Sequence, residues 1–197
     1  MALKPFLLTM LDQATELCHR LAAHGLVVAS DGNASIRTGS GFYITRTRSE
    51  FENLTVDDWR WMPVVGAPTT GVSSEWRMHQ VIFHQLPQVG AIVHCHPPYA
   101  TSFAVRGEAL DGTLLTETAD FGKIAVAAFA APGSGALAKA VIDDLGATGS
   151  ACLLQQHGAL TIGQTFQEAV QRMERLERLA MVQWLVTAGF PAHQTHE

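Results

Sequence analysis

Two histidines separated by one residue, at the end of an apolar run, are the residues of this chain best suited to chemistry. The run that begins at Ala91 leads to His94, and His96 stands directly before Pro97 and Pro98. Alternate side chains of a strand share one face, so both imidazoles can point the same way. Neutral imidazole is a common ligand for zinc and similar metals. The spacing therefore predicts half of a metal site where a strand meets a loop.

A second apolar run delivers a third histidine in the same setting. Leu153 and Leu154 lead towards His157, which is followed by Gly158. Three histidines would leave one position on zinc open, which is the pattern of catalytic rather than structural sites. Glu75 offers a carboxylate that could move a proton beside such a metal. The alternative interpretation is that these are half-buried histidines hydrogen-bonded to backbone.

Length and composition predict one globular domain over residues 1–197. Apolar residues make up 47% of the chain, and the net charge is −5 with a pI near 6.0. No basic block is present, which argues against nucleic-acid and membrane partners. We predict no signal peptide and no transmembrane helix. The three cysteines show no paired spacing, which suits a reducing, cytoplasmic location.

Hydrophobic periodicity predicts the elements that must position the histidines. Helices are expected over residues 6–24, 73–85, 99–105, 133–145 and 166–188. Strands are expected over residues 34–37, 41–45, 60–65, 90–96, 124–128, 151–156 and 159–163, and residues 30–33 are expected to form a turn. Helices and strands alternate with several hairpin-like pairs, which indicates an α/β domain with a largely antiparallel or mixed sheet.

Five motifs, taken in order, resemble the class II aldolase/adducin family, and most closely its L-fuculose-phosphate aldolase type. They are Asp31–Arg37, Ile44-Thr45, Ser73-Ser74-Glu75 with His79, His94–Ala100 and Gln156-His157-Gly158. The resemblance extends over roughly residues 8–188. It implies a three-layer α/β/α sandwich with a central, mainly antiparallel sheet. It also implies a homotetramer with active sites between subunits.

The resemblance further implies reversible aldol cleavage of a small ketose phosphate to dihydroxyacetone phosphate and an aldehyde, through a metal-stabilised ene-diolate. It implies Zn²⁺, or another divalent metal such as Mn²⁺ or Co²⁺, on His94, His96 and His157. Glu75 would be the proton-transfer residue. A phosphate pocket would be formed by Gly32, Asn33, Thr45, Ser73 and Ser74. The start of the helix at Ser73-Ser74 would offer N–H groups and hydroxyls to an anion, and a Gly32-Asn33 turn would let backbone approach it.

One stretch departs from the family pattern. The family usually continues the Ile-Thr strand with Pro-Ser-Gly, whereas this chain has Arg46, Thr47 and Arg48. Arg46 or Arg48 could bind a phosphate through a bidentate fork. They could also select a carboxylate, which would make the substrate a sugar acid, or they could be solvated loop residues.

A second departure concerns the acid that acts on the leaving aldehyde. The family's aldolases take a tyrosine for this role from a neighbouring subunit, and neither Tyr43 nor Tyr99 fits that connection. Glu117 could act as acid or base there, as a glutamate does in dehydratases of the family. The alternatives are therefore a sugar-phosphate dehydratase, 4-epimerase or decarboxylase, or a non-catalytic adducin-like binding module. Intact histidines and Glu75 argue against the module.

Overall fold

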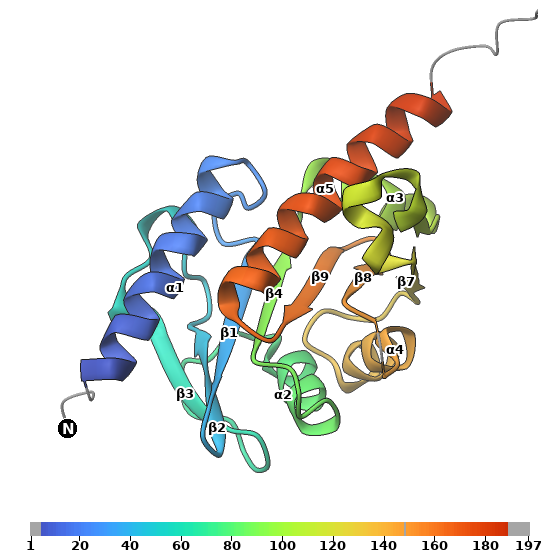
Figure 1. Ribbon diagram of the computed structural model, residues 1–197. Helices are drawn as coiled ribbons and strands as arrows, with labels where there is room; N and C mark the ends of the chain where they lie inside the picture. The colour runs from blue at the N-terminus through green and yellow to red at the C-terminus, as the bar shows by residue number, and fades with distance from the viewer. Residues whose placement is uncertain (1–4, 148, 189–197) are drawn as a thin grey trace, which may run out of the picture.

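A computed structural model describes residues 5–147 and 149–188 and shows helices on both faces of one sheet (Figure 1). The helices are α1 (Pro5–Ala23), α2 (Trp76–Gln85), α3 (Pro98–Arg106), α4 (Gly135–Leu145) and α5 (Phe166–Ala188). The strands are β1 (Gly32–Thr38), β2 (Gly41–Thr45), β3 (Trp59–Pro63), β4 (Ala91–Cys95), β5 (Leu110–Asp111), β6 (Lys123–Ile124), β7 (Val126–Ala127), β8 (Ala151–Leu154) and β9 (Gly158–Gly163). Short 3₁₀ helices are η1 (Phe51–Asn53), η2 (Val56–Asp58), η3 (Gly112–Leu114) and η4 (Thr116–Phe121).

Seven strands form the central sheet in the order β3-β2-β1-β4-β9-β8-β7. Every neighbouring pair is antiparallel except β7 and β8, which are parallel. Strands β5 and β6 form a separate antiparallel pair. The sheet is therefore mixed and mainly antiparallel, which confirms the predicted fold class.

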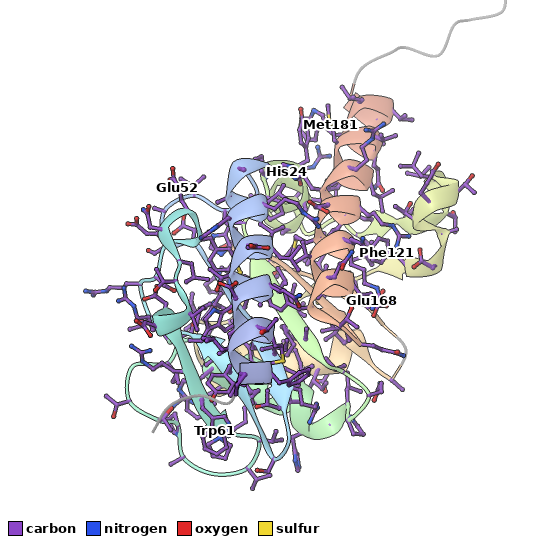
Figure 2. The ribbon with its side chains drawn as sticks, turned by 60° about the vertical axis from the view of Figure 1, so that its left-hand side comes forward. His24, Glu52, Trp61, Phe121, Glu168 and Met181 are labelled. Carbon is purple, nitrogen blue, oxygen red and sulfur yellow. The ribbon has the colours of Figure 1, made fainter. Side chains whose placement is uncertain are left out.

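Two apolar cores lie on opposite faces of this sheet. Helices α1, α3 and α5 contribute to one core, and α2 and α4 contribute to the other. Figure 2 shows α1 and α5 lying side by side, and His24, just after α1, lies 3.0 Å from the Glu174 carboxylate of α5. The layers are thus three helices, the sheet and two helices, as expected for an α/β/α sandwich.

Strand β4 runs through the middle of the sheet and is buried on both faces. Ala91, Val93 and Cys95 point into the core under α1 and α5, whereas Ile92 points into the core under α2 and α4. His94 shares the side of Ile92 because side chains alternate along a strand. The period of two therefore places Cys95 on the opposite face of the sheet from His94.

Three local expectations were wrong. Gly32 and Asn33 do not form a turn but begin β1, where Gly32 pairs with Cys95 and Asn33 pairs with His94. A Cβ on Gly32 would stand 2.9 Å from the backbone oxygen of His94, so glycine is required by close strand packing. Strand β8 ends at Leu154, which places His157 in the turn to β9. Long-range strand pairing decided these boundaries, and local turn signals do not report it.

The third difference concerns the start of α2. The helix begins at Trp76, so Glu75 is its N-cap residue rather than a member of its first turn. Ser73 and Ser74 precede the cap, and the Ser73 hydroxyl accepts a 3.3 Å hydrogen bond from the Glu75 N–H. The helix expected over residues 73–85 therefore starts three residues later, with both serines before its N-cap.

Two further findings bear on the sequence expectations. Cys18, Cys95 and Cys152 are buried and unpaired with one another. Within the described residues, no helix combines the length and the apolar character needed to cross a membrane.

Candidate active site

Three imidazoles converge where β4 and the β8–β9 hairpin end. The Nε2 atom of His94 lies 3.2 Å from Nε2 of His96 and 3.3 Å from Nε2 of His157. Tetrahedral zinc with Zn–N bonds of about 2.0–2.1 Å needs nitrogens about 3.3–3.4 Å apart. The potential ligand atoms of the three residues all lie within 4.8 Å of one another. The donor set therefore fits one divalent ion.

The orientation of His94 is fixed from behind by the neighbouring strand. Its Nδ1 lies 2.9 Å from the carbonyl oxygen of Ala159 in β9. A carbonyl can only accept, so Nδ1 carries the proton and Nε2 keeps its lone pair for a metal. Antiparallel pairing of β4 with β9 thus sets both the tautomer and the aim of this imidazole.

His157 reaches the cluster because of a tight turn. Residues 155–157 join β8 to β9, and Gln156 adopts a left-handed backbone conformation with φ of 57°. A left-handed residue is common in three-residue hairpin loops. A Cβ on the following Gly158 would stand 2.5 Å from the ring of His96. The glycine therefore lets the hairpin lie directly against the second imidazole.

Glu75 faces the cluster from the N-terminal end of α2. Its Oε2 lies 3.0 Å from Nε2 of His94, and its Oε1 lies 3.5 Å from Nε2 of His157. Oε2 also accepts a 2.9 Å hydrogen bond from the Asn33 amide. Oε1 is buried and accepts no hydrogen bond within the described chain. One carboxylate oxygen is held, and the other remains available beside the imidazoles.

The charges in this cluster favour an ionised Glu75. Burial alone would raise the pKa of its carboxyl, but His94, His157 and the hydrogen bond from Asn33 lower it far below its ordinary value. Burial likewise lowers the pKa of His96 to about 3 and that of His157 to about 4. Burial opposes the charge of His94 too, but the Glu75 carboxylate raises the pKa of this imidazole. An anionic base beside the neutral imidazoles of His96 and His157 suits both metal binding and proton abstraction.

A small polar cavity of about 160 Å³ opens over the cluster. Its lining is Ser30, Asp31, Gly32, Asn33, Arg46, Thr47, Arg48, Ser73, Ser74, Glu75, His96 and His157. The structure thus gathers nearly all predicted metal and substrate residues around one opening, with the wholly buried His94 beneath it. Sequence reasoning missed Ser30, Asp31 and Thr47, although Asp31 and Thr47 are adjacent to predicted residues and Ser30 stands two residues before Gly32.

Comparison with known proteins agrees with this geometry. Residues 12–184 match the family described as Class II Aldolase and Adducin N-terminal domain. An L-fuculose phosphate aldolase of Methanococcus maripaludis is 33% identical over 181 residues, covering 87% of this chain and 94% of that protein. A 5-methylthioribulose-1-phosphate/5-deoxyribulose-1-phosphate aldolase of Rhodospirillum rubrum is 31% identical and covers 81% of this chain and 73% of that protein.

The chain belongs to the class II aldolase family. Its fold is also that of a solved relative, the L-fuculose-1-phosphate aldolase of Thermus thermophilus. The two structures align with a TM-score of 0.84 and 28% identity, over 93% of this chain and 99% of the other. The relatives support an enzyme of the class II aldolase type, and related aldolases act on sugar phosphates.

Arg46 and Arg48, where this chain departs from the family pattern, differ in their partners. The Arg46 guanidinium pairs with the Asp58 carboxylate. Arg48 is exposed, lines the cavity, and forms no ion pair with any residue that the structure describes. Its φ is 59°, in the left-handed region that favours glycine. The backbone has therefore kept a glycine-like conformation while gaining a cation.

Two predicted residues lie outside the cavity lining. Thr45 is buried, and its hydroxyl accepts a hydrogen bond from the Ala34 N–H at 3.2 Å, so it braces the β1–β2 hairpin. Glu117 is exposed in η4, where its carbonyl accepts a hydrogen bond from Arg175. Within a single chain, neither side chain joins the cluster of histidines.

A larger hollow of about 690 Å³ lies between α1 and the start of α5. Arg37 lines it, but its guanidinium donates to the backbone carbonyls of Phe83, Leu86 and Val89 at the end of α2. The converging imidazoles and the buried carboxylate are found at the smaller cavity. Chemistry, rather than size, therefore identifies the candidate site.

Proposed function

We propose that this class II aldolase is a metal-dependent lyase that reversibly cleaves a small ketose phosphate to dihydroxyacetone phosphate and an aldehyde. One observation carries the proposal. Glu75 is a buried carboxylate with one oxygen that accepts no hydrogen bond within the described chain. It lies beside three imidazole nitrogens that converge at metal-ligand spacing. A base and a Lewis-acid site at one point suit proton removal next to a carbonyl.

We assign His94, His96 and His157 as the ligands of a divalent ion, zinc first and manganese or cobalt as alternatives. The fixed tautomer of His94 and the neutral state favoured for His96 and His157 suit ligation of such an ion. When bound, the ion would supply Lewis-acid polarisation of the substrate carbonyl.

Glu75 is the proton-transfer residue in this proposal. In the synthetic direction its ionised carboxylate takes a proton from the hydroxymethyl carbon of dihydroxyacetone phosphate, which becomes C3 of the ketose. In the cleavage direction the C3–C4 bond breaks and its electron pair stays on the three-carbon fragment. The C4 hydroxyl loses one proton and C3 gains one, so the overall reaction is balanced. The lowered pKa keeps Glu75 ready as a base near neutral pH.

The rim of the cavity is the proposed site for the substrate phosphate. Ser73 and Ser74 offer hydroxyls just before α2, and Arg48 offers an exposed guanidinium without an ion-pair partner in the described residues. Guanidinium forks bind phosphate oxygens in pairs. Gly32 and Asn33 of β1 also line this rim. Arg46 is already paired with Asp58, so it contributes positive charge rather than a pair of hydrogen bonds to the phosphate.

The rim also supports a second candidate. Arg48 replaces a glycine of the family pattern, and its fork would fit a carboxylate as well as a phosphate. Binding of a carboxylate would make the substrate a sugar acid. The alternative reactions are those of a sugar-phosphate dehydratase, 4-epimerase or decarboxylase built on the same cluster. Product analysis distinguishes these reactions from aldol cleavage.

Assembly is the last part of the proposal. We propose a homotetramer with sites between subunits, in which Glu117 of one subunit approaches the cavity of another. Its exposure in η4, away from the cavity of its own chain, agrees with this placement. Mass measurement in solution tests the assembly independently of activity.

The first experiment uses zinc-loaded protein and dihydroxyacetone phosphate in D₂O. Proton abstraction by Glu75 exchanges one hydroxymethyl hydrogen for deuterium, which NMR detects without any knowledge of the aldehyde. Exchange that is stopped by a chelator and restored by zinc supports the proposal. No exchange by metal-loaded protein would refute aldolase chemistry on this substrate and favour the sugar-acid alternative.

A further inference from the structure

A buried chain of hydrogen bonds lies behind Glu75 and includes a fourth histidine. Ser35 Oγ lies 2.6 Å from Nδ1 of His79, and Nε2 of His79 lies 2.5 Å from Oδ1 of Asn33. Asn33 then donates to Glu75 at 2.9 Å. His79 and Ser35 are completely buried, and Asn33 and Glu75 are nearly so. A continuous polar path thus leads from the interior to the carboxylate.

Donors and acceptors along this path can be arranged in only one way while Glu75 is ionised. A carboxylate only accepts, so the amide nitrogen of Asn33 must face Glu75 and its oxygen must face His79. That oxygen also only accepts, so Nε2 of His79 carries the proton. Burial lowers the pKa of His79 to about 3, so its ring is neutral and Nδ1 accepts from the Ser35 hydroxyl.

The completeness of this network distinguishes it from ordinary core packing. His79 lies on α2 among the buried Met78, Ile82 and Phe83, where an apolar side chain would pack without any hydrogen bond. Every side-chain polar atom of Ser35, His79 and Asn33 has a partner, whereas Oε1 of Glu75 at the cavity end has none. Buried polar networks are costly unless fully satisfied. In this protein the buried network is satisfied at every step from Ser35 to the hydrogen bond that Asn33 donates to the Glu75 carboxylate.

We propose that His79 is a positioning residue for Glu75, acting through the amide of Asn33, with Ser35 holding the ring by a hydrogen bond to Nδ1. If His79 did not donate, the Asn33 amide could flip and present its oxygen to the carboxylate. Oε2 of Glu75 would then lose its hydrogen bond and its fixed place. We call the hydrogen-bonded chain from Ser35 through His79 and Asn33 to Glu75 the lock. With the lock intact, Oε1 of Glu75 stays directed towards the imidazoles. This inference rests on the proposed role of Glu75 in proton transfer.

The first test reads the tautomer of His79 directly and needs no activity. Long-range ¹H–¹⁵N NMR of the wild-type protein should show His79 neutral, with its proton on Nε2, across the neutral pH range. Ser35→Ala should leave the ring neutral with its proton still on Nε2, because the Asn33 oxygen still accepts from it. A proton on Nδ1 of the wild-type ring would overturn the proposal.

The second test compares two replacements of His79 in the deuterium-exchange assay. The carboxamide nitrogen of His79→Gln can replace the Nε2–H donor, whereas His79→Leu cannot. We expect His79→Leu to lower kcat by about 10- to 100-fold with KM and zinc content nearly unchanged, as for a misplaced catalytic group. His79→Gln should recover most of that loss. Equal rates for the Leu and Gln variants would refute the lock.

Controls separate the possible failures. His84→Leu changes an exposed histidine further along α2 and should leave exchange at the wild-type rate. If His79→Leu does not fold, Ser35→Ala provides the activity test, with an expected loss of about threefold, and an unchanged kcat would refute the proposal. Absence of exchange by the wild-type protein would refute the proposed function alone, because the NMR measurement still tests the lock.

Discussion

The two walls of the cavity are built in different ways. One wall consists of buried side chains on strands and a helix end, including Asn33, Glu75 and His94. The other is the exposed segment of Arg46, Thr47 and Arg48 that follows β2. Hydrogen bonds and strand pairing fix the first wall, whereas the second carries the departure from the family pattern. We therefore propose that the buried wall performs the chemistry and that the exposed wall selects the anion.

Removal of a metal ligand should have the largest effect on the buried wall. His157→Ala deletes one of three nitrogens and should abolish both zinc retention and deuterium exchange, with a fall of about 1,000-fold or more. Elemental analysis and the exchange assay measure the two losses together. His84→Ala is the matched control, and full zinc content in the His157 variant would remove this residue from the site.

Replacement of the base should separate chemistry from metal binding. Glu75→Gln keeps the shape of the side chain but cannot take a proton, so exchange should fall by about 100- to 10,000-fold while zinc stays bound. Elemental analysis and exchange are again measured on the same sample. Wild-type exchange in this variant would mean that another group abstracts the proton.

Substitutions in the exposed wall should change substrate binding rather than the rate of the chemical step. Arg48→Ala and Arg48→Gly should each raise KM for a phosphorylated substrate by about tenfold or more, with kcat little changed, because a charged hydrogen-bond donor is lost. Glycine should also relieve the left-handed backbone, stabilising the fold by about 1 kcal/mol and raising Tm by about 2–4 °C. Alanine should not give that increase, and equal Tm values for the two variants would contradict the strain argument.

The smallest effect concerns the ion pair between Arg46 and Asp58, which holds the exposed wall in place. Burial alone would raise the pKa of Asp58, but hydrogen bonds from Arg46 and Thr55 lower it. A lowered pKa in the folded state stabilises the fold above the unfolded pKa, about 3.9, and this contribution is lost as the pH falls through the folded value. Asp58→Asn should therefore cost about 0.5 kcal/mol at pH 7 and less at pH 3, measured by urea unfolding. A constant difference at both pH values would argue against the ion pair.

Periodicity and strand-end spacing, which are local signals, predicted the helices, the α/β class and the cluster of histidines. The three layers were implied by the family resemblance. The predicted spacing of His94 and His96 needs only the strand period of two. The hairpin that carries His157 could be anticipated from two adjacent apolar runs and a glycine. The family motifs supplied the role of Glu75, which periodicity alone does not reveal.

What the sequence could not predict depends on contacts between distant segments. Gly32 and Asn33 resemble a turn locally, but pairing with β4 makes them strand residues. His79 belongs to one of the family motifs, but the sequence assigned it no role, although Glu75 and His79 stand one helical turn apart and could share a face. Its partners Ser35 and Asn33 come from another element, so the lock is visible only in three dimensions. The role of Glu117 depends on a neighbouring subunit and stays a prediction.

The contact between Gly158 and the ring of His96 has a consequence for protein engineering. Because even a methyl group at residue 158 would collide with that imidazole and with the backbone oxygen of Cys95, the hairpin admits no diversity there. The side chains of residues 46–48 are all exposed and leave more room for substitution, although the left-handed backbone at Arg48 favours glycine. A mutant library aimed at new aldehyde acceptors or new anionic groups should randomise residues 46–48 and leave the 157–158 dipeptide unchanged.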